Sequence, residues 1–596
     1  MNKIKRKQST FHLLHFLKPY RVSFLIAVVA ITLENILEIS LPFLMNQLLK
    51  NGMSKTPDGS YTYDAPYVYT IGGIMLGFAV CSFFLGVFSA KFTAKAGRGL
   101  GYELRREEYR KIQDFSFSNL DEFRLNSLIT RMTNDVQIIS DTFCQVLRPL
   151  LRAPVQLVCA IVFALLISKE LSLVFAIVIP ALAILLSVIV FLSRPKFYRL
   201  QGALDSINRT TEESLTAMRM VRANAKKDFE NEKFNTVNTQ VKKIGNSALS
   251  LIALNQGIMQ FMTYACMVGI LLIGGTSVFQ NWHPEIEATK TAADIASFLS
   301  YATQTLTSLM MISMVFMSFT RASASFSRVK EVFDSQSEIV DRKDSSLRVA
   351  DGSIDFDHVS FRYNRSAKEN VLSDITFHIK DGETIGILGE TGSSKSTLIY
   401  LIERFYDATE GRIAISGHDI KDYSLTELRD SIAIAFQSPR LFSGTVRENL
   451  LWGNREATEE DLVKACRIAC CLDVIENSFK DGFDTYISQS GNNISGGQRQ
   501  RICIARAILR NPKILILDDS FSALDRMTEH RLKENLKTEL PHMTKIIISQ
   551  KVSAIKDADR IIVLNDGKIN NIGTGEELLA NDSIYQDIYN IQKEGH

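Results

Sequence analysis

The sequence predicts a multi-domain protein in which an all-α transmembrane bundle of six helices is followed by an α/β P-loop domain. Up to about residue 325 the chain consists of long uncharged runs, whereas beyond residue 350 short apolar runs alternate with charged segments. The second half also contains a glycine loop between a buried strand and a helix, as phosphate-binding domains do. A length of 596 residues is too great for one domain, and a hydrophobic content of 46% excludes a disordered chain. A net charge of +3 is too small to indicate a nucleic-acid partner.

Residues 1–20 are predicted to form an amphipathic elbow at the membrane surface. Their basic residues resemble the start of a secretion signal, but the apolar stretch FHLLHFL is short and no small-residue cleavage site follows it. We therefore expect this segment to lead into the first membrane span.

Six windows are long and apolar enough to cross a bilayer, which takes about 20 residues per helix. The predicted spans are 20–45, 66–90, 153–168, 171–193, 244–282 and 295–320. Lys169 and Glu170 separate the third from the fourth span and predict a tight external turn. The transmembrane domain is accordingly placed at residues 21–325.

The distribution of basic residues predicts the orientation of the bundle. Segments 91–152 and 194–243 each contain 11 Lys and Arg, whereas the three opposite connections contain only Lys50, Lys55, Lys169 and Lys290. Because basic loops are retained on the cytoplasmic side, both termini are predicted to be cytoplasmic. The two basic segments are helix-patterned, so we expect the membrane helices to continue tens of ångströms into the cytosol.

Glu34 and Glu38 interrupt the first span and lie on one helix face, since they are four residues apart. An unpaired carboxylate is costly inside a membrane. Two readings remain open. The pair forms a polar wall of a substrate cavity, or it is satisfied by neighbouring Ser, Asn or Tyr side chains or by proximity to the helix end.

A phosphate-binding loop is predicted between residues 389 and 397. Loop N–H groups and the start of the following helix would face the anion, Lys395 would reach the outer phosphates, and Ser396 would ligate magnesium. The nucleotide-contacting residues predicted here are Gly389, Glu390, Thr391, Gly392, Ser393, Ser394, Lys395, Ser396 and Thr397. Ser394 stands where such loops usually have glycine, which costs about 1–2 kcal/mol if the backbone there needs a positive φ.

A second element supports this site. Residues 514–517 are an apolar run that predicts a buried strand, and Asp518 and Asp519 follow at its carboxyl end, where carboxylates are suited to hold magnesium. Between the loop and this strand, the segment NNISGGQRQRICIARAIL predicts a glycine turn that opens a long helix.

Residues 352–590 resemble the nucleotide-binding domain of ABC transporters, and six spans ahead of it on one chain resemble an exporter-type half-transporter. The resemblance is carried by the loop, the Asp-ended strand, the signature Ser495-Gly496-Gly497-Gln498 and the motif Ser522-Ala523-Leu524-Asp525. It implies a P-loop ATPase domain with a helical subdomain at residues 351–596, joined by a linker at 326–350, and the cofactors ATP and Mg²⁺. It also implies head-to-tail dimerisation, in which Ser495, Gly496, Gly497, Gln498 and Asp525 contact the ATP of the partner chain in trans.

The resemblance assigns further roles. Tyr363 matches the aromatic residue that stacks on adenine, although it could instead be an ordinary strand aromatic. Gln437 matches the glutamine that links magnesium to the membrane helices, and Asp518 matches the magnesium carboxylate, so Ser396, Gln437 and Asp518 form the implied metal set. Segments 115–124 and 210–222 are expected to end in coupling helices that dock on the nucleotide-binding domains.

Three positions and one four-residue segment depart from the family pattern. Asp519 replaces the glutamate that polarises the attacking water, Gln550 replaces the switch histidine, and Ser394 replaces the loop glycine. Residues 488–491 read SQSG where related chains often read VGExG. Because Ser394, Asp519 and Gln550 belong to one nucleotide site while the signature is intact, the chain resembles the degenerate subunit of heterodimeric multidrug exporters, with a weakly hydrolytic site of its own.

The predicted function is ATP-driven export of lipophilic drugs or lipids, with a second half-transporter as partner, across a bacterial cytoplasmic membrane. A homodimeric lipid or peptide exporter is the alternative, disfavoured because it would contain two impaired sites. A third reading is a regulatory or channel-like protein gated by ATP binding, and inward transport on the same frame also stays open.

Overall fold

The computed structural model describes residues 13–594 except 56–60, 168, 281–286, 365, 366, 368 and 391. The chain forms two compact units. The first, the membrane unit, comprises the residues up to Gln113 together with Asn126–Ser335, and the second, the nucleotide unit, comprises Asp114–Leu125 with Gln336 onward.

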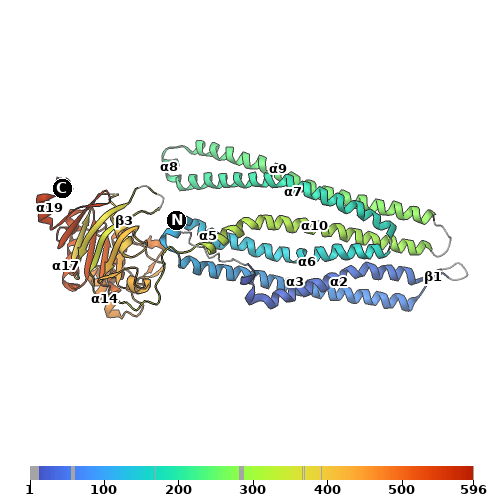
Figure 1. Cartoon of the computed structure of the whole chain (residues 1–596), viewed down its shortest axis with the longest axis horizontal. Helices are drawn as coiled ribbons and strands as arrows, with labels where there is room; N and C mark the ends of the chain where they lie inside the picture. The colour runs from blue at the N-terminus through green and yellow to red at the C-terminus, as the bar shows by residue number, and fades with distance from the viewer. Residues whose placement is uncertain are drawn as a thin grey trace. The chain divides into compact units, whose positions relative to one another are not determined.

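Among its described residues, the membrane unit contains six helices that are long and apolar enough to cross a membrane (Figure 1). They are α2 (Arg21–Asn51), α3 (Ala65–Gln113), α6 (Val136–Ile167), α7 (Lys169–Thr216), α9 (Lys227–Gln280) and α10 (Glu287–Asp334). Shorter elements are α1 (Leu13–Phe16), η1 (Lys18–Tyr20), the hairpin of β1 (Met53–Lys55) and β2 (Tyr61–Tyr63), α5 (Leu125–Thr130), the π-helix η2 (Arg131–Asp135) and α8 (Met218–Ala223). Most of the predicted elbow, residues 1–12, lies outside the described residues.

Four of these helices are far longer than a bilayer requires. Helices α3, α7, α9 and α10 have 49, 48, 54 and 48 residues, about 70–80 Å each at 1.5 Å per residue. The prediction that the charged segments continue the membrane helices is therefore confirmed as far as their helical structure is concerned.

The helices pack in pairs, α2 along α3, α6 along α10 and α7 along α9 (Figure 1). In the core between α7 and α10, the rings of Phe175 and Phe298 stack at 4.9 Å, and the buried Tyr301 hydroxyl donates to the Ile39 carbonyl oxygen at 3.1 Å. Large apolar side chains such as Phe191 remain on the outer surface, 79% exposed. Such an apolar exterior suits a lipid environment, because lipid tails are as apolar as the exposed side chains.

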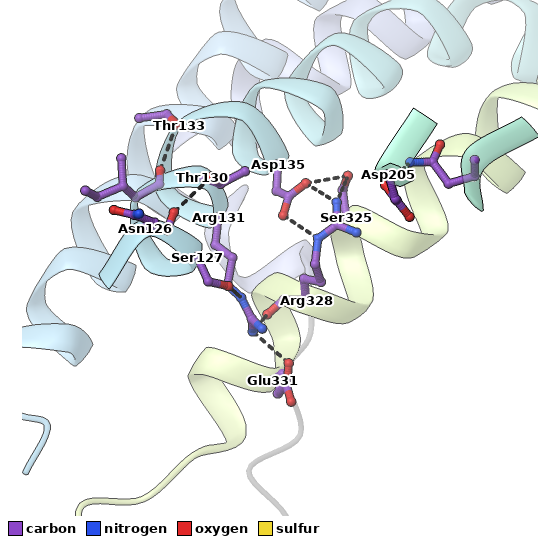
Figure 2. A network of polar contacts seen from close by, with 12 residues as sticks. Asn126, Ser127, Thr130, Arg131, Thr133, Asp135, Asp205, Ser325, Arg328 and Glu331 are labelled. Carbon is purple, nitrogen blue, oxygen red and sulfur yellow. Dashed lines mark hydrogen bonds and ion pairs between the residues drawn. The ribbon is translucent and has the colours of Figure 1, made fainter. Parts of the chain in front are cut away.

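A polar network joins η2, directly before α6, to the end of α10 (Figure 2). The fully buried Asp135 accepts from Ser325 Oγ at 2.8 Å and from Arg328 Nε at 2.7 Å. One turn away, Arg131 Nη1 donates to Glu331 at 2.7 Å and to the Arg328 carbonyl oxygen at 2.8 Å. Each pair joins a buried charged group, Asp135 or Arg131, to a more exposed partner on α10, and such charge-assisted hydrogen bonds keep the two segments in a single register.

The nucleotide unit is built on two main sheets. The first has the order β14-β13-β5-β12-β11-β8, with only β14 antiparallel to its neighbour, and the second is antiparallel with the order β4-β3-β6-β7. The strands are β3 (Ile354–Phe361), β4 (Leu372–Ile379), β5 (Thr384–Leu388), β6 (Glu410–Ile415), β7 (His418–Asp419), β8 (Ile432–Ala435), β9 (Gly444–Thr445), β10 (Tyr486–Ile487), β11 (Ile514–Asp518), β12 (Thr544–Ser549), β13 (Arg560–Asn565) and β14 (Lys568–Gly573).

Helices surround these sheets. They are α4 (Phe117–Phe123), α11 (Lys395–Ile402), α12 (Leu425–Asp430), α13 (Val446–Leu451), α14 (Glu459–Ile468), α15 (Leu472–Asn477), α16 (Gly496–Leu509), α17 (Arg526–Glu539), α18 (Val552–Ile555), α19 (Gly575–Asn581) and α20 (Ser583–Glu594), with the short 3-10 turns η3 (Gly482–Asp484) and η4 (Gln489–Gly491). The central strands β11 and β12 are buried along their whole length, as parallel strands covered on both faces are. Because β5 and β11 run parallel, their carboxyl ends bring the loop and the acidic pair to one edge.

Helix α10 ends at Asp334, so residues 326–334 of the predicted linker are helical. In the nucleotide unit, α4 is grouped with residues from Gln336 onward although it lies far earlier in the sequence. The other domain boundaries given by the sequence stay predictions.

Glu403, at the carboxyl end of α11, is expected to make the unit less stable as the pH rises. Burial raises the pKa of its carboxyl from 4.5 to about 8, against the opposing charges of Arg429 and Arg510. The folded state therefore holds a proton that the unfolded state releases, and the stabilisation present below pH 4.5 is lost as the pH rises to about 8. Glu403→Gln removes this titration, so its Tm should exceed that of the wild type by about 3 °C at pH 9 and by less at pH 6. Differential scanning fluorimetry measures this, with the exposed Glu460→Gln as control; equal pH profiles for Glu403→Gln and wild type would contradict it.

Candidate functional site

The predicted phosphate loop lies between the end of β5 and the start of α11. Ser394 is the N-cap residue of α11 with φ = 71° and ψ = 23°, so a left-handed backbone is present at a residue that has a Cβ. This conformation costs about 1–2 kcal/mol outside glycine. Gly389 is required by packing, because a Cβ there would lie 2.6 Å from the Leu564 carbonyl oxygen. Thr391 lies outside the described residues.

Lys395 lies against its own loop. Its Nζ donates to the carbonyl oxygens of Gly389 and Glu390 at 2.7 Å each and to Ser393 Oγ at 3.2 Å. Burial lowers the pKa of the Lys395 ammonium, and the nearby carboxylates at the end of β11 partly offset that effect. The loop therefore presents one cation beside the acidic pair.

The two residues of the acidic pair have different neighbours: Asp518 contacts Ser396, and Asp519 contacts Gln437. Asp518 is 5% exposed, and Ser396 Oγ donates to its Oδ2 at 3.5 Å, as expected if both serve the same ligand. Burial, followed by the negative charge of Asp519, raises the pKa of Asp518 to about 6. Hydroxyl and carboxylate oxygens are the ligand type that Mg²⁺ prefers.

Asp519 lies just beyond the strand with φ = 43°, and its N–H donates to the Ile548 carbonyl oxygen at 2.9 Å. Gln437 Nε2 donates to Asp519 Oδ2 at 3.3 Å, which places the predicted glutamine beside the acidic pair. Burial raises the pKa of the Asp519 carboxyl as well. Four predicted residues, from α11, β11 and the segment after β8, thus meet at one edge of the sheet.

Gln550 follows β12 and has an exposed side chain. A residue that the sequence reasoning missed fixes this segment. Gln592 of α20 donates through Nε2 to the Gln550 carbonyl oxygen at 2.7 Å and accepts at Oε1 from the Val552 N–H at 2.8 Å. The Gln592 side chain therefore restrains the backbone of this segment at two residues, Gln550 and Val552.

Replacing Gln592 by Ala is expected to loosen residues 550–552. Two hydrogen bonds of about 1 kcal/mol each are lost, so the Val552 amide should exchange with solvent about 30-fold faster. Hydrogen–deuterium exchange with mass spectrometry measures this. The control is Gln586→Ala on the same helix, whose side chain donates instead to Leu579 at 2.8 Å. Unchanged exchange at Val552 in the Gln592 variant would show that α20 does not restrain the segment.

Tyr363 follows β3 and lies beside the loop. Its hydroxyl and Thr397 Oγ1 are 2.9 Å apart, and its ring packs edge-on against Phe361 and Tyr406 at 4.9 and 5.1 Å. The side chain is nevertheless 45% exposed. A half-exposed ring next to a phosphate loop is available for stacking on a base.

The signature begins α16. Ser495 is the N-cap residue, with Ser495 Oγ accepting from the Gln498 N–H at 3.3 Å and Gln498 Oε1 accepting from the Ser495 N–H at 2.9 Å. A Cβ on Gly497 would lie 2.9 Å from the Ala523 carbonyl oxygen, whereas a Cβ on Gly496 would meet nothing within 4 Å. The helix start is therefore well formed, and Gly496 lies on its open side.

Two further predicted motifs are ordered by local hydrogen bonds. Asp525 caps α17 and accepts from the Thr528 N–H at 2.9 Å, and this backbone bond lowers the pKa of the Asp525 carboxyl. In the SQSG segment, Ser488 donates to Asn493 Oδ1 through its N–H at 2.9 Å, and Ser490 has φ = 61°.

Both segments predicted to contain coupling helices contain short helices. The first is α4, whose capping box joins Ser116 to Asn119 and whose Phe117 ring stacks on Phe405 at 4.4 Å within the nucleotide unit. The second is α8 in the membrane unit, where Met220 is 69% exposed.

Glu34 and Glu38 form ion pairs that the sequence reasoning did not expect. Glu34 is buried and pairs with Arg148, with Arg152 at 4.0 Å and Ser89 Oγ at 3.5 Å. Glu38 pairs with Arg152. Both arginines had been counted with the basic connection after the second span, but they lie on α6, within the bundle. The substrate-cavity role of the two carboxylates stays a prediction.

Together, the fold and the site define a membrane protein with an attached unit that binds a nucleoside triphosphate. Residues 24–309 match the family model of the ABC transporter transmembrane region, and residues 372–522 match that of the ABC transporter. The chain is 35% identical over 579 residues to the uncharacterized ABC transporter ATP-binding protein YfiB of Bacillus subtilis (strain 168), covering 97% of this chain and 98% of YfiB. It is also 30% identical to the ATP-dependent lipid A-core flippase of Syntrophus aciditrophicus (strain SB), covering 97% of this chain and 94% of the flippase.

A solved structure of a bacterial Atm1-family ABC exporter with ATP bound shares the fold with a TM-score of 0.81, covering 96% of this chain and 98% of that chain at 22% identity. The chain belongs to the ABC transporter family and has the architecture of an exporter-type half-transporter. It is a multi-pass membrane protein and an ATP-binding, ATP-hydrolysing transporter. The predicted family, domain types and activity class are thereby confirmed.

Proposed function

We propose that the chain exports lipophilic drugs or lipids as one half of a heterodimeric transporter in a bacterial cytoplasmic membrane, with both termini in the cytoplasm. Its own ATP site is degenerate, and its signature completes a competent site on the partner. The observation that carries the proposal is the contrast between Asp519 and Gln550, which are poorly suited to hydrolysis, and a signature with every residue and its capping bonds intact.

The own site lacks a well-placed general base. Asp519 is one methylene shorter than glutamate, and a displacement of about 1 Å can reduce a rate by about 100-fold. Its Oδ2 accepts from Gln437, which draws the carboxylate toward that side chain. Gln550 is neutral and cannot become an imidazolium beside the terminal phosphate. Asp519, Gln437 and Gln550 together support a site that binds ATP but hydrolyses it slowly.

ATP with Mg²⁺ is the proposed ligand of the loop site. Ser396 Oγ and the Asp518 carboxylate are close together, and the amide of Gln437 is next to Asp519, so hard oxygen donors gather at one edge. A bound magnesium ion would neutralise charge on the phosphates. Lys395 would supply a second positive charge there, and Tyr363 would orient the base by stacking.

The signature residues are proposed to act in trans. A Cβ on Gly496 would meet nothing within 4 Å, so this side of α16 can approach another chain. Head-to-tail dimerisation also provides a partner for the hairpin tip around α8, where Leu215 at the end of α7, Met220 of α8 and Phe229 at the start of α9 are 64%, 69% and 64% exposed. Exposed apolar side chains at the tip of a helical hairpin are typical of a docking surface.

Lipophilic cargo is supported by one relative, which is itself named as a flippase for lipid A-core, and by the ion pairs along α2 and α6. Arg148, with a side chain 42% exposed, adds charge to a bundle that has mostly apolar side chains on its surface. A lipid or drug with both an apolar body and a polar group would match such a strip, in which Glu34 and Glu38 form the proposed polar wall.

ATPase activity in lipid nanodiscs tests the proposal. The chain alone is compared with the chain co-purified with the product of any adjacent half-transporter gene. Turnover is expected only in the mixed complex. Robust turnover of the chain alone would mean that Asp519 and Gln550 support hydrolysis, and the homodimeric exporter would then be the better assignment. Nucleotide-dependent conductance without turnover would favour the channel-like alternative.

A further inference from the structure

An aromatic pair directly after α11 lies between the predicted adenine site and α4. Helix α11 ends at Ile402, and Arg404 adopts φ = 51°, which turns the chain so that the Phe405 N–H donates to the Tyr400 carbonyl oxygen at 2.8 Å. Tyr406 follows. All of these residues belong to the nucleotide unit, as does α4.

On one side the pair contacts α4. The Phe405 ring stacks on Phe117 at 4.4 Å, and the Tyr406 hydroxyl donates to Asp121 Oδ2 at 2.7 Å. Phe117 and Asp121 are four residues apart and therefore share one face of the helix. A hydrogen bond to a carboxylate is stronger than one between neutral groups, so the contact fixes both position and direction.

On the other side the pair contacts the adenine site. The Tyr406 ring packs edge-on against Tyr363 at 5.1 Å and 88°, and Tyr363 in turn reaches Thr397 of the phosphate loop helix. Burial, together with the bond to Asp121, raises the pKa of the Tyr406 hydroxyl well above its usual range. The hydroxyl therefore remains a donor at neutral pH.

We propose that Tyr406 is a positioning residue for ATP at this chain's own site. Its hydroxyl takes its direction from Asp121 on α4, and its ring edge sets the orientation of Tyr363. Nucleotide binding and the placement of α4 are thereby coupled, and the coupling is reciprocal. This inference rests on the proposed stacking of adenine on Tyr363.

The test uses the full-length complex in nanodiscs and photolabelling with 8-azido-ATP, because gel separation of the chains reports labelling of this chain alone. Tyr406→Phe, which keeps the ring, and Asp121→Ala, which removes the acceptor, are each expected to raise the half-saturating concentration about fivefold, at the lower end of typical coupling between sites. The double variant should be no worse than either single variant, because both remove the same bond. Tyr400→Phe is the matched control, since its hydroxyl has no hydrogen bond among the described residues.

A second readout separates positioning from packing. Hydrogen–deuterium exchange of residues 114–125 should fall when ATP is added to the wild type, and should fall less in Tyr406→Phe. A lower Tm with unchanged half-saturation and unchanged α4 protection would show that Tyr406 only packs, and would overturn the inference. Additive effects in the double variant would do the same.

Tyr363→Ala distinguishes a failure of the coupling through Tyr406 from a failure of the adenine site itself. If it weakens labelling while Tyr406→Phe does not, the coupling through Tyr406 is wrong and the adenine site stands. If Tyr363→Ala leaves nucleotide affinity unchanged, the assignment of Tyr363 itself fails, and the inference fails with it.

Discussion

Replacing Gly496 by Asp should reduce ATP turnover of the heterodimer by about 100-fold or more, because it places a negative charge where the partner's phosphates would bind. The folded domain should tolerate the change, since a Cβ at Gly496 meets nothing within 4 Å. Asp519→Asn, in contrast, should lower turnover only slightly, because the own site contributes little hydrolysis. Steady-state phosphate release from the purified complex measures both.

The controls separate chemistry from folding. Ile591→Asp adds the same charge on α20, at a side chain that is 71% exposed, and should leave turnover near the wild-type rate. Gly497→Ala should instead disturb the fold, because its Cβ would lie 2.9 Å from the Ala523 carbonyl oxygen. Loss of turnover in Asp519→Asn with none in Gly496→Asp would reverse the proposed division of labour between the two chains.

Restoring the two family residues in the own site should have the opposite effect. The double substitution Asp519→Glu with Gln550→His is expected to raise ATP turnover of the chain purified alone by about 100-fold, since glutamate extends the carboxylate by about 1 Å and histidine can carry a proton. Phosphate release at saturating ATP and magnesium is the measurement.

Lys395→Ala in the same background is the control for this gain, because it removes the cation beside the acidic pair and should return turnover to the background rate. An unchanged rate in the double variant, with nucleotide binding retained, would show that Asp519 and Gln550 do not limit the own site. The left-handed Ser394 would then be the next residue to restore, as glycine.

The sequence predicted most of the architecture because its signals are local. Hydropathy runs identified the six helices, and a loop between strand and helix identified the phosphate site, with Ser396, Asp518, Gln437 and Asp519 then found at one sheet edge. The pairing of Glu34 with Arg148 could not be predicted, because the partners are 114 residues apart and the arginine read as part of a basic loop.

Two positioning contacts could not be predicted from the sequence for a related reason. Gln592 acts on Gln550 from a helix at the end of the chain, and nothing in the local pattern of α20 distinguishes it from other polar helix residues. Tyr406 and Asp121 are 285 residues apart. The aromatic pair after α11 was visible in the sequence, but its partner helix lies in the other half of the chain, so only the folded structure joins them.

The inclusion of α4 in the nucleotide unit means that the chain passes between its two units at three places, near residues 113, 125 and 335. A fragment that starts at Gln336 would therefore lack one of its own helices. Phe405 and Tyr406 would lose the cover of Phe117 and Asp121, leaving an aromatic surface open to water and to self-association. Cleavage within residues 336–350 alone would likewise fail to release the unit, because α4 would still tether it to the membrane helices.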